Sequence, residues 1–210
     1  MTCYLFGAGC YPEQIPMPDV TDLVIAVDGG LTVCHRLGLS PQLAVGDFDS
    51  LGRRPNEGEV VALPVHKDDT DMAVALEEGV KRGATRFVLL GGDGGRPDHT
   101  YANYLLLARA AARGHTAYMV GQTYASAVLC GSSLTIPRGG EGTLSLFAIG
   151  GEASGVSLDG VEYPLRDATL SPLDPLGVSN RIVGEGARVS VRQGKVLLLW
   201  EMGEKFVFPS

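Results

Sequence analysis

The sequence has few cysteines and no long apolar run. Its four cysteines, Cys3, Cys10, Cys34 and Cys130, form neither a CxxC pair nor the dense spacing of a disulfide framework. The first residues, MTCYLFGAGCYPE, lack the basic start and apolar core of a signal peptide. No run approaches the ~20 apolar residues that a membrane-spanning helix needs. These absences predict a reduced, cytoplasmic protein without a membrane partner.

Clusters of basic residues are absent as well. Acidic residues outnumber basic ones by 24 to 17, the formal net charge is −7, and no basic run is longer than the pair Arg53 and Arg54. Binding of nucleic acid through a basic face is therefore disfavoured. The chain also lacks a G-x-x-x-x-G-K-[ST] motif, which excludes P-loop chemistry. An acidic protein can still bind phosphates if a divalent cation neutralises both sides.

The first 120 residues alternate between short apolar, β-branched runs and segments of helical period. Two segments place apolar residues one helical turn apart and end at a glycine, 70–82 before Gly83 and 98–113 before Gly114. Several of the apolar runs are apolar throughout, as in a sheet that is covered on both faces. The predicted strands of this largely parallel sheet lie within 3–9, 22–30, 42–50, 59–65, 86–92 and 115–121.

The helical period disappears after Gly121. Short segments separated by glycine, proline and serine follow, which is the rhythm of an all-β sandwich. These predicted strands lie within 126–130, 133–137, 143–149, 187–193, 195–200 and 205–209. The sequence therefore predicts an α/β domain over residues 1–122 and an all-β sandwich domain over residues 123–210.

Four polar stretches follow predicted strands of the α/β domain. They are DGG at 28–30, GDFDS at 46–50, HKDDTD at 66–71 and GGDGGRPDH at 91–99. Ligands of parallel sheets bind beyond the carboxyl ends of the strands, where the next helices point their N-termini. Many carboxylates in one crevice would repel one another unless a cation lies among them. We therefore expect these stretches to meet around a cation.

The hard carboxylate oxygens favour Mg²⁺, which commonly completes its octahedral shell with phosphate oxygens and water. Asp47 and Asp49 stand on the same side of an extended segment, so both can face one metal ion. Lys67 and Arg96 are the cations of these stretches and would bind phosphates, arginine through its bidentate fork. Glycines around Arg96 would let backbone N–H groups approach a polyphosphate.

Each acidic residue also has a structural interpretation. Asp28 before two glycines could serve only a turn, while Asp69 and Asp98 could serve only as caps of the helices that follow them. Tyr163 could equally be a half-buried residue of the sandwich. Asp49 has the weakest structural role, since one aspartate already serves the turn.

Other functions fit parts of the same pattern. Gly7, Gly9 and Asp28 imitate a dinucleotide-binding fingerprint, but Pro12 stands where that pattern needs glycine or alanine. DFDS is similar to the DxD motif of haloacid-dehalogenase-like phosphatases, yet it follows the third strand, not the first. A metal-dependent phosphatase and a nucleotide-binding module without turnover remain alternatives.

The order of the motifs DGG, GDFDS, K-D-x-T-D and G-G-R-x-D-H resembles the thiamine pyrophosphokinase family. A β domain with G-V-E-Y-P-L and V-S-N follows, as in that family, so the resemblance covers nearly the whole chain. It implies an enzyme that moves the diphosphoryl group of ATP to the hydroxyl of thiamine. The products would be thiamine diphosphate and AMP, and such transfers depend on positioning and charge neutralisation.

The resemblance also implies roles for individual residues. The Mg²⁺ ligands, direct or through water, would be Asp28, Asp47, Asp49 and Asp71. ATP would be bound by Lys67, Asp68, Arg96 and Asp98. The catalytic residues would be Asp71, Arg96 and Asp98.

The family further implies a homodimer in which thiamine lies between the α/β domain of one subunit and the β domain of its partner. Tyr163, Ser179 and Asn180 would then contact thiamine from the β domain. An aromatic ring at Tyr163 suits a cationic thiazolium or a flat pyrimidine, through cation–π attraction of about 0.5–2 kcal/mol or through stacking.

Overall fold

The computed structural model of the protein describes residues 1–48, 58–63 and 69–210. The chain divides into two compact units. The α/β unit comprises Met1–Tyr11 and Met17–Asn103, and the β unit comprises Pro12–Pro16 and Tyr104–Ser210. The predicted division into functional domains at residue 122 is not tested by these units and stays a prediction.

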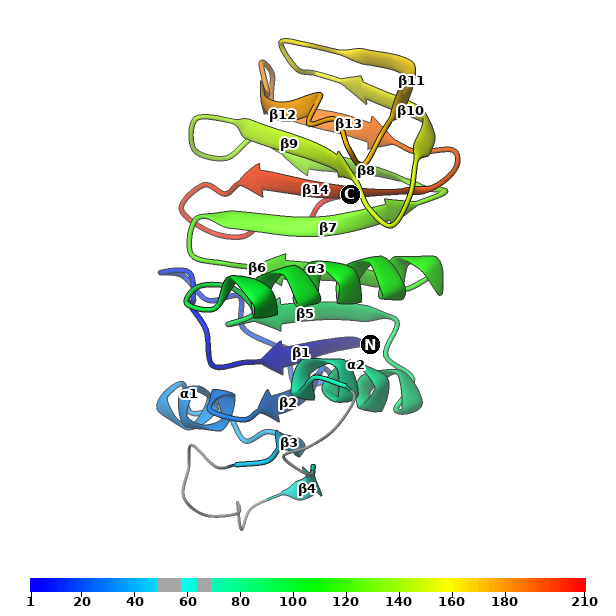
Figure 1. The fold of residues 1–210 in the computed structure, drawn as a ribbon. Coiled ribbons are helices and arrows are strands. Elements are labelled where there is room, and N and C mark those ends of the chain that lie inside the picture. The colour runs from blue at the N-terminus through cyan, green and yellow to red at the C-terminus, as the bar shows by residue number, and fades with distance from the viewer. Residues whose placement is uncertain (49–57, 64–68) are drawn as a thin grey trace. The chain divides into compact units, whose positions relative to one another are not determined.

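The α/β unit is built on a parallel sheet with the strand order β4-β3-β2-β1-β5 (Figure 1). The strands are β1 (Thr2–Phe6), β2 (Leu23–Val27), β3 (Leu43–Gly46), β4 (Glu59–Ala62) and β5 (Arg86–Leu90). All five residues of β2 are buried, whereas the edge strand β4 has none fully buried. Unbroken apolar runs thus form the inner strands, and the α/β prediction is confirmed.

Three helices follow strands of this sheet: α1 (Gly30–Arg36), α2 (Asp71–Lys81) and α3 (Pro97–Ala112). α1 and α2 pack against β1 and β2. The Thr70 hydroxyl accepts a hydrogen bond from the Ala73 N–H, so the N-cap of α2 is Thr70 and not Asp69. The sequence predicted α2 and α3. It did not predict α1, which has seven residues and is too short to show a helical period.

The β unit contains two antiparallel arrays of strands. One has the order β6-β7-β14-β9-β12, and the other has the order β11-β10-β13-β8 (Figure 1). Buried and partly exposed residues alternate along β8 and β9, as expected where one face of a sheet meets a core. The bounds are β6 (Thr116–Val120), β7 (Tyr124–Cys130), β8 (Ser133–Pro137), β9 (Thr143–Ala148), β10 (Ala153–Asp159), β11 (Leu165–Leu170), β12 (Gly177–Arg181), β13 (Gly186–Ser190) and β14 (Lys195–Glu201). The predicted all-β second half is therefore confirmed.

Two details of the β unit differ from the sequence prediction. Residues 205–209 form no strand, and Phe206 and Phe208 pack edge-on against each other and against Tyr118 of β6. Strands β10, β11 and β12 were not among the predicted segments. Register shifts interrupt the pairing of β10 with β11 and of β12 with β9, and such bulges break the period of two on which the prediction relied.

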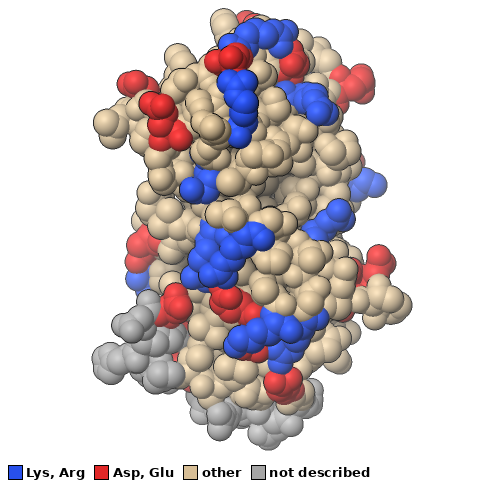
Figure 2. Space-filling view, turned by 90° about the vertical axis from the view of Figure 1, so that its right-hand side faces the viewer, with Lys and Arg blue, Asp and Glu red and all other residues tan. Residues whose placement is uncertain are grey.

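No helix in the described part of the chain is long and apolar enough to cross a membrane. Charged side chains of both signs are interspersed over the face shown in Figure 2.

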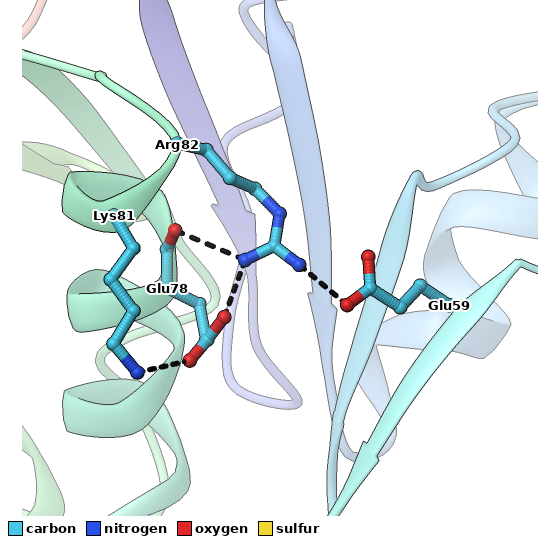
Figure 3. Close-up of polar contacts among 4 residues, drawn as sticks. All are labelled: Glu59, Glu78, Lys81 and Arg82. Carbon is cyan, nitrogen blue, oxygen red and sulfur yellow. Dashed lines mark hydrogen bonds and ion pairs between the residues drawn. The ribbon is translucent and has the colours of Figure 1, made fainter.

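A network of ion pairs joins the end of α2 to the edge strand β4 (Figure 3). The Arg82 guanidinium donates to the carboxylate and the backbone carbonyl of Glu78, and it lies 2.8 Å from the carboxylate of Glu59. Lys81 Nζ lies 2.7 Å from the Glu78 carboxylate. These bonds from Lys81 and Arg82 lower the pKa of Glu78. The network therefore stabilises the fold when Glu78 is ionised.

We expect Arg82→Ala to lower the free energy of unfolding at pH 7 by about 1 kcal/mol, which is about 2–4 °C in Tm for a chain of this size. The folded state lowers the pKa of Glu78. The stabilisation from Glu78 is therefore fully present above the pKa that Glu78 has in the unfolded chain, and it is lost as the pH falls through the pKa that Glu78 has in the folded protein. The stability difference from wild type should therefore shrink in acid. Thermal unfolding between pH 3 and pH 7 measures it.

Lys81→Ala is the matched control, because the Lys81 side chain is 69% exposed, whereas that of Arg82 is 25% exposed. Lys81→Ala should lower the free energy of unfolding by less than Arg82→Ala does. Equal Tm values for Arg82→Ala and wild type at pH 7 would contradict a stabilising role of the network.

Candidate active site

A cavity of about 340 Å³ lies at the carboxyl ends of the parallel strands of the α/β unit. Its walls come from the segments after β1, β2 and β5, from the first turn of α2 and from the first two turns of α3. The polar side chains that line it are Asp28, Thr70, Asp71, Asp93, Arg96, His99 and Asn103. Three of the four polar stretches found in the sequence thus contribute described residues to one cavity.

The segment after β1 runs against the segment after β5. Gly7 N–H donates to the Leu90 carbonyl, Gly9 N–H to the Gly91 carbonyl and Cys10 N–H to the Asp93 carbonyl, at 2.7, 2.9 and 2.8 Å. A Cβ on Gly9 would lie 2.7 Å from the Gly91 carbonyl oxygen, so only glycine permits this approach. These glycines therefore hold two loops together. Their N–H groups are engaged by protein carbonyls, and β1 is followed by β2 with no helix between them, so the helix N-terminus that a dinucleotide-binding fingerprint requires does not follow these glycines.

Asp28 follows β2 and adopts a left-handed backbone conformation, with φ of 48°. Its N–H donates to the Val45 carbonyl of β3 at 2.9 Å. A Cβ on Gly46 would overlap the Asp28 carboxylate, so the glycine of GDFDS makes the space that this carboxylate occupies. The DGG and GDFDS motifs are thus in direct contact, as the sequence analysis expected.

The rest of GDFDS is divided between two environments. Phe48 is buried, with 4% of its surface exposed, whereas Asp47 is partly exposed. The structure thus separates the phenylalanine, which packs in the core, from the aspartate before it. Asp49, Lys67 and Asp68 lie outside the described residues, so their predicted roles stay predictions.

Arg96 and Asp98 bind each other at the start of α3. Arg96 donates to both carboxylate oxygens of Asp98, from Nε at 3.2 Å and from Nη2 at 2.5 Å, and both side chains are largely exposed. This pairing lowers the pKa of the Asp98 carboxyl. Pro97 is the first helical residue, a position where its missing N–H leaves no bond unmade. The guanidinium fork is therefore presented at a helix N-terminus beside the cavity.

The predicted metal ligands are partly brought together. Asp28 and Asp71 line the same cavity. Within residues 1–48, 58–63 and 69–210, no three His, Cys, Asp or Glu side chains form a group that could hold a metal ion, and Asp49 is not among these residues. The four-residue ligand set therefore stays a prediction.

Two cysteines of the α/β unit are shielded by burial. Cys3 and Cys34 are buried, and burial raises the pKa of each thiol to about 12, which keeps both protonated at neutral pH. Burial also raises the pKa of the Asp93 carboxyl in the loop after β5.

The residues predicted to contact thiamine lie together in the β unit, but they differ in exposure. Tyr163 is 66% exposed, whereas Asn180 on β12 is 7% exposed. The Asn180 amide donates to the Tyr163 carbonyl at 2.7 Å and accepts from the N–H groups of Tyr163 and Arg181 at 3.1 and 2.8 Å. Asn180 thus holds the backbone of Tyr163 in place.

Ser179 lies next to this clamp at an irregularity of β12. Its φ of 58° is left-handed, its N–H donates to the Ser145 hydroxyl at 3.0 Å, and it falls at the register shift between β12 and β9. Such strained residues persist where the surrounding structure holds them, and they often cluster at ligand sites. The bulge leaves Ser179 exposed.

Asn103 and Thr70 line the cavity but were not among the predicted site residues. Thr70 could have been found as the capping residue before a helical period. Asn103 has no local signal, because it lies in the second turn of α3 and its partner, the Gly92 carbonyl, is in the loop before the helix. Its role follows only from the folded chain.

Comparisons with known proteins point to one family. A family model described as thiamin pyrophosphokinase, catalytic domain, matches residues 17–119, and one described as thiamin pyrophosphokinase, vitamin B1 binding domain, matches residues 133–196. The thiamine pyrophosphokinase of Bacillus subtilis (strain 168) is 25% identical over 195 residues, which is 90% of this chain and 91% of that protein.

Solved structures give the same result for the fold. The crystal structure of thiamine pyrophosphokinase from Bacillus subtilis matches with a TM-score of 0.85 and 21% identity, covering 96% of this chain and 99% of that one. A thiamin pyrophosphokinase family protein from Enterococcus faecalis matches with a TM-score of 0.81 and 25% identity, covering 96% and 99%. The arrangement of elements is therefore shared over nearly the entire length.

Proposed function

Because the chain belongs to the thiamin pyrophosphokinase family, we propose that it transfers the diphosphoryl group of ATP to thiamine, giving thiamine diphosphate and AMP. It is an enzyme of the thiamine diphosphokinase type. The observation that carries the detailed proposal is the cavity of the α/β unit. Three carboxylates (Asp28, Asp71 and Asp93), one arginine and the N-termini of two helices border it.

In the proposed reaction, the hydroxyl oxygen of thiamine forms a bond to the β-phosphorus of ATP. The bond from this phosphorus to the oxygen that leads to the α-phosphate breaks, AMP leaves, and the hydroxyl proton is released. The protein contributes mainly positioning and charge, since no covalent intermediate is required. Asp71, Arg96 and Asp98 are the proposed catalytic residues.

The nucleotide side of the cavity suits a polyphosphate. α2 and α3 begin at Asp71 and Pro97, so the positive ends of both helix dipoles lie at the cavity. We expect phosphate oxygens to compete with Asp98 for the Arg96 fork, which binds a carboxylate and a phosphate in the same geometry. Lys67 and Asp68 complete the proposed ATP-binding set.

The donor chemistry of the cavity fits Mg²⁺. Asp28 and Asp71 offer carboxylate oxygens there, and Mg²⁺ is usually held by one or two carboxylates together with phosphate oxygens and water. We propose Asp28, Asp47, Asp49 and Asp71 as the residues that hold it, directly or through water. When bound, the cation would neutralise phosphate charge.

Thiamine is proposed to bind where the α/β unit of one subunit meets the β unit of its partner in a homodimer. The Tyr163 side chain, 66% exposed on a backbone that Asn180 clamps, supports a role as an aromatic platform. Ser179 would contact thiamine directly. Asn180 would act mainly through Tyr163, because backbone groups engage both ends of its amide.

The nucleotide product distinguishes the proposed reaction from its alternatives. Incubation of the protein with thiamine, ATP and Mg²⁺ should give AMP and thiamine diphosphate in equal amounts, because the β-phosphorus is attacked. Chromatography of the nucleotides measures this. ADP as the product would indicate an ordinary kinase, free phosphate a phosphatase, and tight ATP binding without product a non-catalytic module.

Substitutions test the proposed carboxylate ligands. Asp47→Asn, Asp49→Asn and Asp71→Asn should each lower kcat/KM by about 100-fold or more, the usual cost of losing one preorganised electrostatic contact. Their Tm values should stay close to that of wild type. Calorimetric titration with Mg²⁺ and ATP gives a second readout, in which binding should weaken.

Asp19→Asn is the control for this series, because Asp19 is an exposed carboxylate near the amino end of β2, away from the carboxyl ends that form the cavity. It should leave both activity and binding unchanged. Near-normal turnover of Asp47→Asn or Asp49→Asn at moderate Mg²⁺ would count against the metal role of that residue.

Mixed dimers test the proposed shared thiamine pocket. Asp71→Asn and Tyr163→Ala proteins should each be weakly active. In a mixed dimer of the two variants, one of the two pockets is built only from wild-type units. Random pairing makes about half of the dimers mixed, so it should restore up to about a quarter of wild-type activity. Mixing after reversible dissociation, followed by a rate assay, measures this. A monomeric mass in solution, or no recovery in a confirmed mixed dimer, would contradict the proposal.

A further inference from the structure

The loop between β5 and α3 has an irregular backbone, which the hydrogen bonds of a helix or strand do not hold in place. Gly91, Gly94 and Gly95 all have positive φ values, between 63° and 88°. The loop also lines the cavity from Gly91 to Arg96. Its shape must therefore be held by bonds from neighbouring elements.

Three successive carbonyls of this loop each have a donor. The Gly91 and Asp93 carbonyls accept from the N–H groups of Gly9 and Cys10, in the segment after β1. The Gly92 carbonyl, between them, accepts from Asn103 Nδ2 at 2.6 Å. Asn103 belongs to α3, so the loop is tied to the segment after β1 on two carbonyls and to a helix on the third.

Asn103 is one of the few buried polar residues among those described, with 6% of its surface exposed. An amide in this position is costly to bury unless it is hydrogen-bonded. The surrounding residues of α3, such as Leu106 and Leu107, are buried and apolar. Helix packing alone would thus be served by an apolar residue, and the bond to Gly92 explains the amide.

The bond also determines the orientation of a neighbouring donor. A trans peptide is planar, with its C=O and N–H pointing in opposite directions. Holding the Gly92 carbonyl therefore holds the Asp93 N–H, which belongs to the same peptide. In loops that bind phosphate, such backbone N–H groups are the anion donors.

We propose that Asn103 is a positioning residue of the nucleotide site, whose amide holds the loop of residues 91–96 in the shape that binds the phosphates of ATP. The inference rests on the proposed function for the identity of the ligand. Asn103 acts through the Gly92 carbonyl and is not assigned a contact with substrate.

The test compares Asn103→Ala and Asn103→Asp with wild type. In the nucleotide-free protein, amide hydrogen exchange of the peptide that covers residues 91–96 should be faster in Asn103→Ala. It should be faster still in Asn103→Asp, because a carboxylate oxygen would face the Gly92 carbonyl. If the Asn103 side chain only filled space, exchange would be slower in Asn103→Asp than in Asn103→Ala, since aspartate has nearly the shape of asparagine.

The kinetic readout is selective for one substrate. Asn103→Ala should raise the KM for ATP by about tenfold, the size expected for the loss of one buried hydrogen bond, while the KM for thiamine stays unchanged. Calorimetry with ATP alone should show the same tenfold weakening. Unchanged ATP affinity and unchanged loop exchange in Asn103→Ala would overturn the inference.

Leu107→Ala controls for general loosening of α3. Leu107 is fully buried and lies four residues after Asn103 on the same helix. Its replacement by alanine should lower Tm without changing the KM for ATP. An equal rise in KM for ATP in Leu107→Ala would also overturn the inference. If wild type forms no AMP, the proposed function fails, whereas the exchange and ATP-binding measurements still decide the role of Asn103.

Discussion

The hydrogen bonds between the segment after β1 and the segment after β5 are the constraint on which the cavity depends. They join two backbones directly, through the N–H groups of Gly7, Gly9 and Cys10. Because both strands are parallel neighbours, their carboxyl ends leave the sheet at the same edge, and glycines allow the two chains to touch there. The remaining walls, from Asp28 to the start of α3, are arranged around this pair of loops.

Charge at the cavity is balanced by contacts of different strength. Arg96 and Asp98 pair at an exposed helix start, where solvent screening makes the pair weak and exchangeable. Asp28 and Asp71 line the cavity, so a cation and an anionic ligand would each lower the cost of binding the other. With a bound cation, a site that is acidic overall would not need a basic face to attract a polyphosphate.

Two buried asparagines have the same structural role in different units. Asn103 holds the Gly92 carbonyl beside the cavity of the α/β unit, and Asn180 holds the backbone of Tyr163 in the β unit. Both asparagines are almost fully buried, so a missing bond would leave a buried amide group unsatisfied. In each case the side chain fixes the backbone of a segment that is distant in the sequence.

Local patterns in the sequence were sufficient to predict the parallel sheet, helices α2 and α3, the all-β second half and the motifs at the strand ends. Hydrophobic period, capping residues and glycines act between near neighbours, so they can be read without the fold. Tertiary structure alone decided that Gly9 is needed for loop contact, that Asn180 clamps Tyr163, and that Asn103 holds Gly92. It did so because a buried polar group is satisfied by whichever backbone the fold brings beside it, and residue spacing does not reveal that partner.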